Sequence, residues 1–267
     1  MTQYLIIFLV ALLITALGFQ YYVHFFSVCY GFSIAAIALG IALLSMTKLN
    51  IVTALILLLL IFYGSRLGGY LLYRESKVSS YNNRVKDDIK DEGDIKFIGK
   101  YMMWISCALL YTLQTCPVLF RFINPDVDHT KIDVPACIGL VIIFIGVVME
   151  LIADMHKTAF KRTNPGRFVS TGLYAFVRCP NYLGEILVWT GVLVSGIGVV
   201  RGLQWIPAVL GWLLIVYVMF SGARRLEIRQ NKTYGNDPAY QAYALKVPIL
   251  IPFIPLYSVE KFTFLKA

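Results

Sequence analysis

The sequence has few charged residues and little material for a metal or disulfide site. Only 15% of its 267 residues are charged, against roughly 25% in an average soluble domain. The three histidines are scattered, and the five cysteines show no paired spacing. Asp126, Asp128, His129 and Asp133 share one loop, but without a second cluster we interpret them as a solvated loop. Neither a disulfide framework nor a metal site is predicted.

Familiar nucleotide-binding and catalytic motifs are missing as well. The chain contains no GxGxxG fingerprint, no P-loop, no GxSxG elbow and no HExxH pair. Any nucleotide site in this chain therefore has to be built between helices.

Apolar residues are what the chain does contain. They make up 58% of the sequence, and the mean hydropathy is +0.71, which indicates a membrane protein. The net charge of +9 comes from basic residues in short loops, a distribution that membrane topology explains better than nucleic-acid binding. The N-terminal apolar run lacks a basic start and a small-residue cleavage site, so we expect a retained helix.

Seven apolar runs are long enough to cross about 30 Å of hydrocarbon as helices. We therefore predict an all-α, polytopic membrane bundle of about seven helices, forming one integral domain over residues 1–267. The predicted spans are 2–20, 24–46, 49–70, 100–122, 134–153, 181–200 and 203–222.

Three loops carry most of the basic charge: 74–96, 157–178 and 224–246. By the positive-inside rule they face the cytoplasm, which places the N-terminus outside and the C-terminus in the cytoplasm. Residues 1–75 then form a front group of three helices, 76–97 a cytoplasmic linker, and 98–257 the core. We expect a multi-pass protein of the endoplasmic reticulum in a eukaryote or the inner membrane in a bacterium.

Charged residues mark one face at the end of the fifth span. Glu150, Asp154, Lys157 and Lys161 follow the spacing of a single helical face. Carboxylates inside a span are costly and often functional. The alternative is an ordinary interfacial helix end with snorkelling lysines.

Asn181 and Glu185 stand one helical turn apart at the start of the sixth span, after Pro180 in a position that suits a first helical turn. Their amide and carboxylate match the hydrogen-bonding groups of a carboxamide or a ribose. A polar helix start explains Asn181 equally well, but it explains Glu185 less well, since Glu185 lies a turn further into an apolar run.

The third span ends with Arg66 and Tyr70, one turn apart and separated by Gly68 and Gly69. A phenol near a guanidinium is a better acid than one in water, so Tyr70 is a candidate proton donor to a carbonyl oxygen. The alternative is an aromatic belt residue beside a snorkelling arginine. Gln114, in the middle of the fourth span, is a further intramembrane polar group.

The segment with Arg178, Pro180, Asn181, Tyr182, Gly184 and Glu185 resembles the steroid 5-alpha-reductase C-terminal superfamily, and more closely its DUF1295 branch. The resemblance covers roughly residues 60–257. Weaker matches are Glu150, Asp154 and Lys157, Arg66 and Tyr70, Gln114 with Pro117, and the ending PAYQAY followed by IPFIP.

The resemblance implies an oxidoreductase that uses NADPH to reduce a conjugated carbon–carbon double bond in a sterol-like or enoyl lipid. Asn181 and Glu185 would contact the nicotinamide, Asp154 and Glu150 the ribose, and Lys161 and Arg178 the phosphates. Lys157 and Tyr182 would complete the cofactor site, Tyr70 would be catalytic, and Arg66 and Gln114 would contact substrate. Membrane lipids and the lipid substrate are the expected partners; neither nucleic acid nor an obligate protein partner is expected.

Two positions depart from this pattern. Cys179 stands where the family usually has histidine, and the first two spans offer no glutamate to partner Tyr70. The same architecture occurs in isoprenylcysteine carboxyl methyltransferases, which use S-adenosylmethionine, but only Glu227 of their paired glutamates is present, in Leu226-Glu227. A methyltransferase and a non-catalytic lipid-binding protein are the alternatives.

Overall fold

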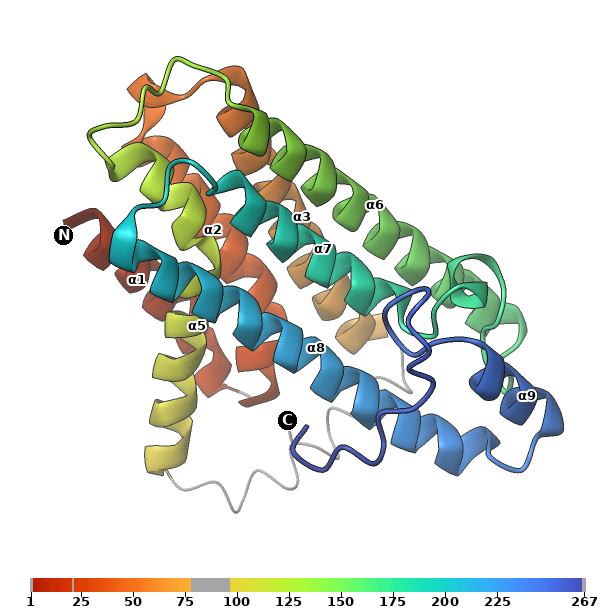
Figure 1. Ribbon diagram of the computed structural model, residues 1–267. Helices are drawn as coiled ribbons and strands as arrows, with labels where there is room; N and C mark the ends of the chain where they lie inside the picture. Colours follow the sequence, from red (N-terminus) through yellow and green to blue (C-terminus); the bar gives the residue numbers. More distant parts are fainter. Residues whose placement is uncertain (1, 21, 78–96, 266–267) are drawn as a thin grey trace. The chain divides into compact units, whose positions relative to one another are not determined.

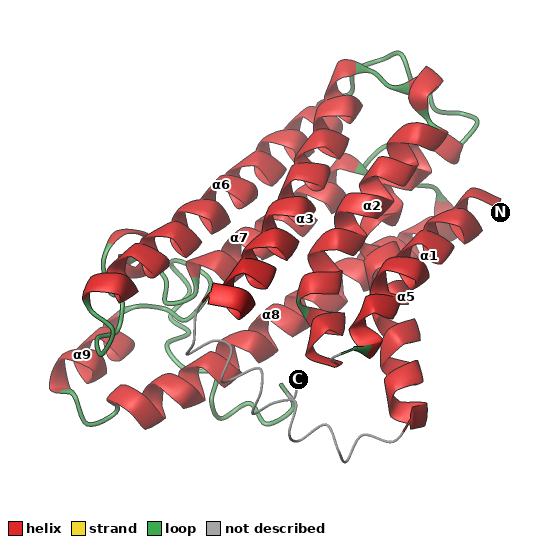
Figure 2. Ribbon diagram, turned by 180° about the vertical axis from the view of Figure 1, so that it is seen from behind, coloured by secondary structure: helices red, strands yellow, loops and turns green. Residues whose placement is uncertain are grey.

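The structure is a computed structural model that describes residues 2–20, 22–77 and 97–265 (Figure 1). Within these ranges the regular structure is helical, with no strand (Figure 2). The α-helices are α1 (Thr2–Thr15), α2 (Val28–Leu44), α3 (Ile51–Lys77), α5 (Phe97–Ile123), α6 (Val134–Thr163), α7 (Pro180–Ser195), α8 (Trp205–Tyr234) and α9 (Pro238–Lys246). The all-α prediction is confirmed.

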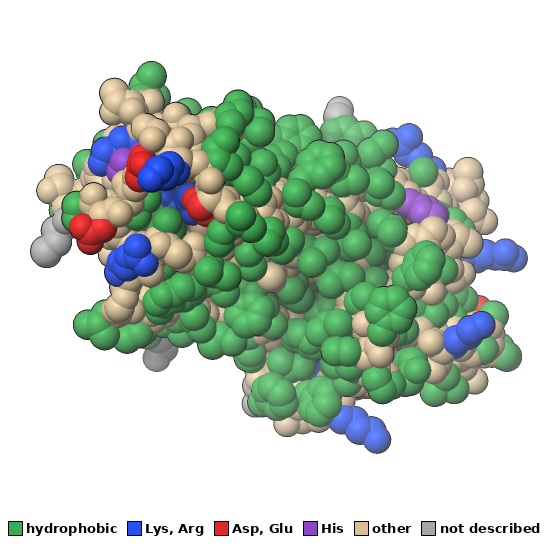
Figure 3. Space-filling model, turned by 45° about the horizontal axis from the view of Figure 1, so that its top comes forward, with side chains coloured by type: hydrophobic (Ala, Val, Ile, Leu, Met, Phe, Trp, Pro, Cys, Tyr) green, Lys and Arg blue, Asp and Glu red, His purple; other side chains and the backbone are tan. Residues whose placement is uncertain are grey.

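In the described part of the chain, five helical segments are long and apolar enough to cross a membrane. They correspond to α1, α3, α5, α6 and α8. α2 has 17 residues and α7 has 16, fewer than the roughly 20 that a straight crossing needs. Large apolar side chains are exposed along these helices, among them Leu13, Leu58 and Phe144, and hydrophobic side chains cover much of the face in Figure 3. The chain is therefore a multi-pass membrane protein.

All seven predicted spans correspond to helices, but several ends differ. α6 continues to Thr163 and α8 to Tyr234. Each helix thus extends beyond the apolar run that was used to predict it, into charged sequence. α7 ends at Ser195 and not at the expected residue 200. Gly198, which follows the helix, adopts a positive φ of 84°. The predicted linker at 76–97 lies mostly outside the described residues. The orientation of the termini stays a prediction.

The chain divides into two compact units, described separately below. Unit 1 comprises Met1–Leu140 and Val192–Gly211, and unit 2 comprises Val141–Gly191 and Trp212–Ala267. The division passes through α6, α7 and α8.

Unit 1 is organised around close helix packing. α1, α2, α3 and α5 lie side by side, and α2 meets α3 at Gly31, Gly64 and Gly68. A Cβ on Gly31 would lie 2.4 Å from the Gly68 nitrogen and 2.6 Å from the Gly64 oxygen. Only glycine permits such a close approach of two backbones. Close packing of this kind stabilises helix association in lipid, where the hydrophobic effect does not drive helices together.

One end of unit 1 is fastened by polar contacts. Arg121 is buried and donates to Asp133 and, at 2.5 Å, to the Ser195 carbonyl. Asn124 and Gln204 exchange side-chain hydrogen bonds of 2.7 and 2.8 Å. These contacts satisfy buried polar groups that would otherwise destabilise the fold.

Unit 2 contains the later part of α6, the first part of α7, most of α8, α9 and the C-terminal tail. A core that includes Val177, Leu183, Ala223 and Ile249 joins the segment before α7 to α8 and the tail. α9 begins at Pro238, where the Asp237 carboxylate caps the Ala239 nitrogen at 2.9 Å. This unit contains the sequence motif at 178–185.

Candidate functional site

α6 and α7 touch through their backbones within unit 2. A Cβ on Gly146 would lie 2.6 Å from the Gly184 oxygen, and one on Gly184 would lie 2.8 Å from the Gly146 oxygen. The same Gly184 position is 3.1 Å from the Cβ of Glu150. The contact therefore brings the charged face of α6 beside the motif on α7. The residue pattern of either helix alone does not predict this contact.

Three predicted carboxyl residues are buried along this seam. Their exposed fractions are 3% for Glu150, 8% for Asp154 and 5% for Glu185. The Trp189 indole nitrogen donates to a Glu185 oxygen at 3.4 Å. A buried carboxylate is stable only with hydrogen-bond donors or cations around it, so three of them make this seam a candidate binding region.

Asn181 and Tyr182 begin α7 and are both half-buried. α7 starts at Pro180, as the sequence predicts. The Tyr182 ring lies against α8, where a Cβ on Gly222 would be 3.3 Å from two ring carbons. The first turn of α7 thus offers an amide and a phenol at the edge of the buried carboxylates.

The basic end of α6 is tied to its surroundings. Lys157 is half-buried. Lys161 donates to the Tyr234 hydroxyl at 2.8 Å and to the Arg167 carbonyl, with a longer contact to the Pro165 carbonyl. An ammonium has three hydrogens, so a phosphate would have to replace one of these contacts. The predicted phosphate contact of Lys161 stays a prediction.

Arg178 is turned into unit 2, with an exposed fraction of 1%. Its Nη2 donates to Glu227 Oε1 at 2.6 Å and to the Tyr257 carbonyl at 2.5 Å. Glu227 Oε2 accepts from the Val259 nitrogen at 2.8 Å. We interpret Arg178 as a structural residue that joins the start of α7 to α8 and the tail; its contact with phosphate stays a prediction.

Glu227 is the residue whose importance the sequence did not reveal. Sequence comparison presented it as half of a methyltransferase pair, whereas here it is 2% exposed and bound by Arg178 and Val259. A single glutamate next to the apolar Leu226 was the available signal. Its partners lie 49 and 32 residues away, so spacing could not identify them.

Cys179, which stands in place of the expected histidine, is fully buried with Val177, Leu183 and Ala223. Burial raises the pKa of its thiol to about 12. The thiol is therefore neutral at physiological pH, and the position contributes packing instead of a charge.

An aromatic cluster lies near the end of α6, and sequence analysis did not predict it. Phe168 stacks on Tyr243 with ring centroids 5.3 Å apart and meets Tyr240 edge-on at the same distance. Tyr243 donates to the Tyr174 carbonyl at 2.7 Å, and burial raises the pKa of Tyr243. The cluster fixes the loop before α7 against α9.

The remaining predicted residues belong to unit 1. Arg66 and Tyr70 are half-buried on α3, and the Arg74 guanidinium lies 5.4 Å above the Tyr70 ring. Gln114 is 3% exposed, and neither polar atom of its side chain has a hydrogen-bond partner among the described residues. A site that unites these residues with those of unit 2 stays a prediction.

No metal centre is indicated in the described ranges, where no group of three or more His, Cys, Asp or Glu residues is placed to hold an ion. Comparison with protein families matches residues 5–247 to the family model described as "Protein of unknown function (DUF1295)". Searches of the curated proteins and of the solved structures found no match.

Proposed function

We propose a function for this chain, which belongs to the DUF1295 family. It is a membrane-embedded reductase that uses NADPH to reduce a conjugated carbon–carbon double bond of a sterol-like or enoyl lipid. The observation that supports it best is the buried acidic seam of Glu150, Asp154 and Glu185 beside Asn181. Three buried carboxyl groups next to an amide offer several hydrogen-bond acceptors and a donor to a polar ligand.

The seam fits the nicotinamide riboside half of NADPH. Carboxylates accept hydrogen bonds from ribose hydroxyls, and an asparagine amide pairs with a carboxamide through one donor and one acceptor. Asn181 and Glu185 would hold the carboxamide, and Glu150 and Asp154 the ribose. Lys157 and Tyr182 lie half-buried at the edge of this region and would contact the adjoining groups.

When bound, NADPH supplies a hydride for the β carbon of the conjugated lipid. The chain's contribution would be to exclude water and to polarise the substrate. Tyr70 would hydrogen-bond the carbonyl oxygen and provide the proton that balances the hydride, with Arg74 over its ring. Arg66 and Gln114 would position the lipid. A buried glutamine whose amide has no hydrogen-bond partner among the described residues suits this task, because an unsatisfied amide in an apolar interior is costly.

Ligand-dependent stability tests the proposal. Purified protein in nanodiscs would be melted with NADPH, NADH or S-adenosylmethionine; a site occupied at 100 times Kd stabilises by about 2.7 kcal/mol. We expect NADPH to raise the melting temperature. Stabilisation by S-adenosylmethionine alone would instead support the methyltransferase, and no response to any of the three would support a lipid-binding protein.

Variants at the seam locate the site. We expect Asn181→Ala and Glu185→Gln to weaken NADPH binding about tenfold each, the effect of losing one good hydrogen bond to a ligand. Thr190→Ala is a matched control on the same helix, since Thr190 bonds to Ile186 and Trp212 inside unit 2. Unchanged NADPH affinity in both seam variants would refute the site assignment.

A further inference from the structure

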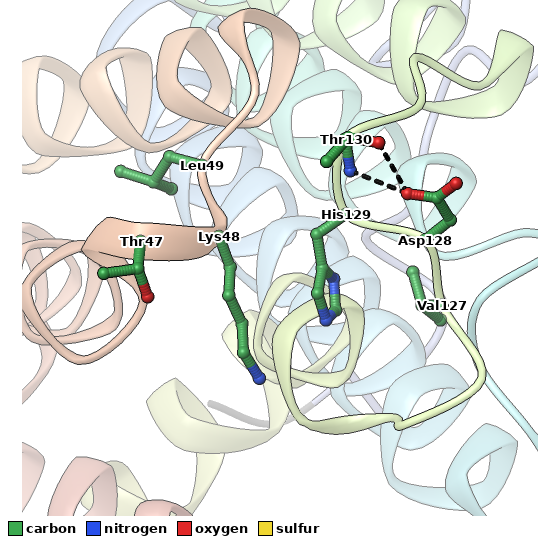
Figure 4. Close-up of a pocket in the computed structure, with 7 residues that line it drawn as sticks. All are labelled: Thr47, Lys48, Leu49, Val127, Asp128, His129 and Thr130. Atoms are coloured by element: carbon green, nitrogen blue, oxygen red, sulfur yellow. Dashed lines mark hydrogen bonds between the residues drawn. The ribbon is translucent and has the colours of Figure 1, made fainter.

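A cleft of about 310 Å³ lies between two loops of unit 1 (Figure 4). One wall is the connection between α2 and α3, and the other is the loop between α5 and α6. In Figure 4, Lys48 and His129 extend from opposite walls into the space between them. The lining residues are Thr47, Lys48, Leu49, Val127, Asp128, His129 and Thr130.

Both walls are held in place by hydrogen bonds. The Asn50 amide donates to the carbonyls of His129 at 2.9 Å and Lys131 at 3.1 Å, which fastens one loop to the other. Lys48 Nζ donates to the Phe122 carbonyl at 2.8 Å. One of the three ammonium hydrogens is thereby used, and two are left for a ligand.

Among the residues that line the cleft, Lys48 supplies a positive charge and Asp128 a negative one. Among the described residues Lys48 forms no ion pair. The Asp128 carboxylate instead serves its own loop, accepting from the Thr130 hydroxyl at 2.7 Å and nitrogen at 3.1 Å and pairing with Lys131 at 3.4 Å. These contacts lower the pKa of Asp128. Burial lowers the pKa of His129, with the charge of Lys48 adding to the effect.

An anion between Lys48 and His129 would offset the charge of Lys48, which disfavours protonation of His129. It would accept from the Lys48 ammonium and the Thr47 hydroxyl, and it would favour a protonated imidazole on His129. The chemistry of the cleft therefore suits a phosphate group, a common ligand of a lysine point charge.

The surroundings of the cleft distinguish a lipid phosphate from a free one. Met46 and Ile51 flank its first wall, and Ile132 and Val134 follow its second, with exposed fractions between 55% and 70%. Ile51 and Val134 begin helices that are long and apolar enough to span a membrane, so these side chains would lie where acyl chains meet headgroups.

We propose that this cleft binds the phosphate group of a phospholipid, with Lys48 as its charged ligand and Thr47 and His129 as hydrogen-bonding partners. The acyl chains would lie along the exposed apolar residues beside the loops. This site belongs to unit 1 alone and is independent of the proposed reductase activity.

Native mass spectrometry of the full-length protein released from nanodiscs tests the proposal. The nanodiscs would contain phosphatidylglycerol, phosphatidylethanolamine or, as a phosphate-free lipid, diacylglycerol with the same acyl chains. We expect one retained phospholipid per chain and no retained diacylglycerol. Lys48→Gln should lower phospholipid occupancy about tenfold, as expected for the loss of one charge-assisted hydrogen bond.

Lys131→Gln is the matched control, because Lys131 is an exposed lysine of the α5–α6 loop and does not line the cleft; lipid occupancy of this variant should equal that of the unmodified protein. If Lys48→Gln fails to fold, Thr47→Val should still lower occupancy several-fold. Equal occupancy in both cleft variants, or equal retention of diacylglycerol, would overturn the proposal. A last test compares how well inorganic phosphate and phospholipid protect Lys48 from chemical acylation. Equal protection by the two would identify a free-phosphate site and would also overturn the proposal.

Discussion

The buried pair of Arg178 and Glu227 allows a quantitative test of the fold around the motif. Their side chains are 1% and 3% exposed, and the two atoms of the ion pair are 2.6 Å apart. Removing one partner of such a pair leaves an uncompensated charge in the interior, which typically costs about 3–5 kcal/mol. We therefore expect Glu227→Leu to destabilise the protein strongly, with a fall in melting temperature on the order of 10 °C.

A double-mutant cycle separates this charge effect from lost packing. Arg178→Met combined with Glu227→Leu removes both charges, and replacing a buried pair by apolar residues of similar volume is often near neutral. The double variant should thus be more stable than Glu227→Leu alone, with a coupling energy of roughly 1–3 kcal/mol. Thermal unfolding in one fixed detergent is the assay.

Proteolysis of the C-terminal tail is a second assay of the Glu227→Leu substitution. The pair holds the tail through the Tyr257 carbonyl and the Val259 nitrogen, so Glu227→Leu should speed proteolytic removal of the residues beyond Tyr257. Lys261→Gln is the control, because Lys261 is an exposed residue of the same tail and such substitutions usually change stability by less than about 0.5 kcal/mol. The reasoning would be refuted if Glu227→Leu behaved like Lys261→Gln in both assays.

Three further predictions concern the remaining site. Gly184→Leu should prevent folding of the α6–α7 seam and abolish NADPH-dependent stabilisation, since a Cβ there would lie 2.8 Å from the Gly146 oxygen; a folded, NADPH-responsive variant would contradict the backbone contact. Cys179 should resist alkylation at pH 8 until the protein unfolds, because its pKa is about 12; since the folded state holds this proton more tightly than the unfolded state, the associated stability is present below about pH 8.5 and is lost as the pH rises toward 12. Tyr70→Phe should lose lipid reduction while keeping NADPH affinity, and normal turnover by this variant would exclude Tyr70 from the mechanism.

The helices could be predicted because their signal is local. Among the described residues, apolar runs identified α1, α2, α3, α5, α6, α7 and α8, and Pro180 correctly indicated the start of α7. The extension of α6 to Thr163 was already implied by the helical spacing from Glu150 to Lys161. α9 was missed because its nine residues are short and only weakly amphipathic, although Asp237 and Pro238 form a recognisable helix start.

The candidate site could be predicted only in part. The spacing of Asn181 and Glu185 gave their shared face, but their approach to Glu150 depends on the contact of Gly146 with Gly184, which joins residues distant in sequence. The partners of Arg178 depend equally on tertiary structure. The family resemblance implied a phosphate contact for Arg178, and this contact stays a prediction; the ion pair of Arg178 with Glu227 is visible only in the structure.

The motif therefore combines two tasks in eight residues. Its first part, Arg178 and Cys179, is buried and fastened: their backbone nitrogens donate to Pro248 and Ile249 of the tail at 2.9 and 3.0 Å. Its second part, from Asn181 to Glu185, begins α7 and meets α6 at Gly184, which packs against Glu150. Because the helix start is anchored immediately before Asn181, the amide and carboxylate that we assign to the cofactor are held at the end of a rigid support, as a preorganised binding site requires. Loosening the anchor at Glu227 should consequently weaken NADPH binding without altering any group that touches the cofactor.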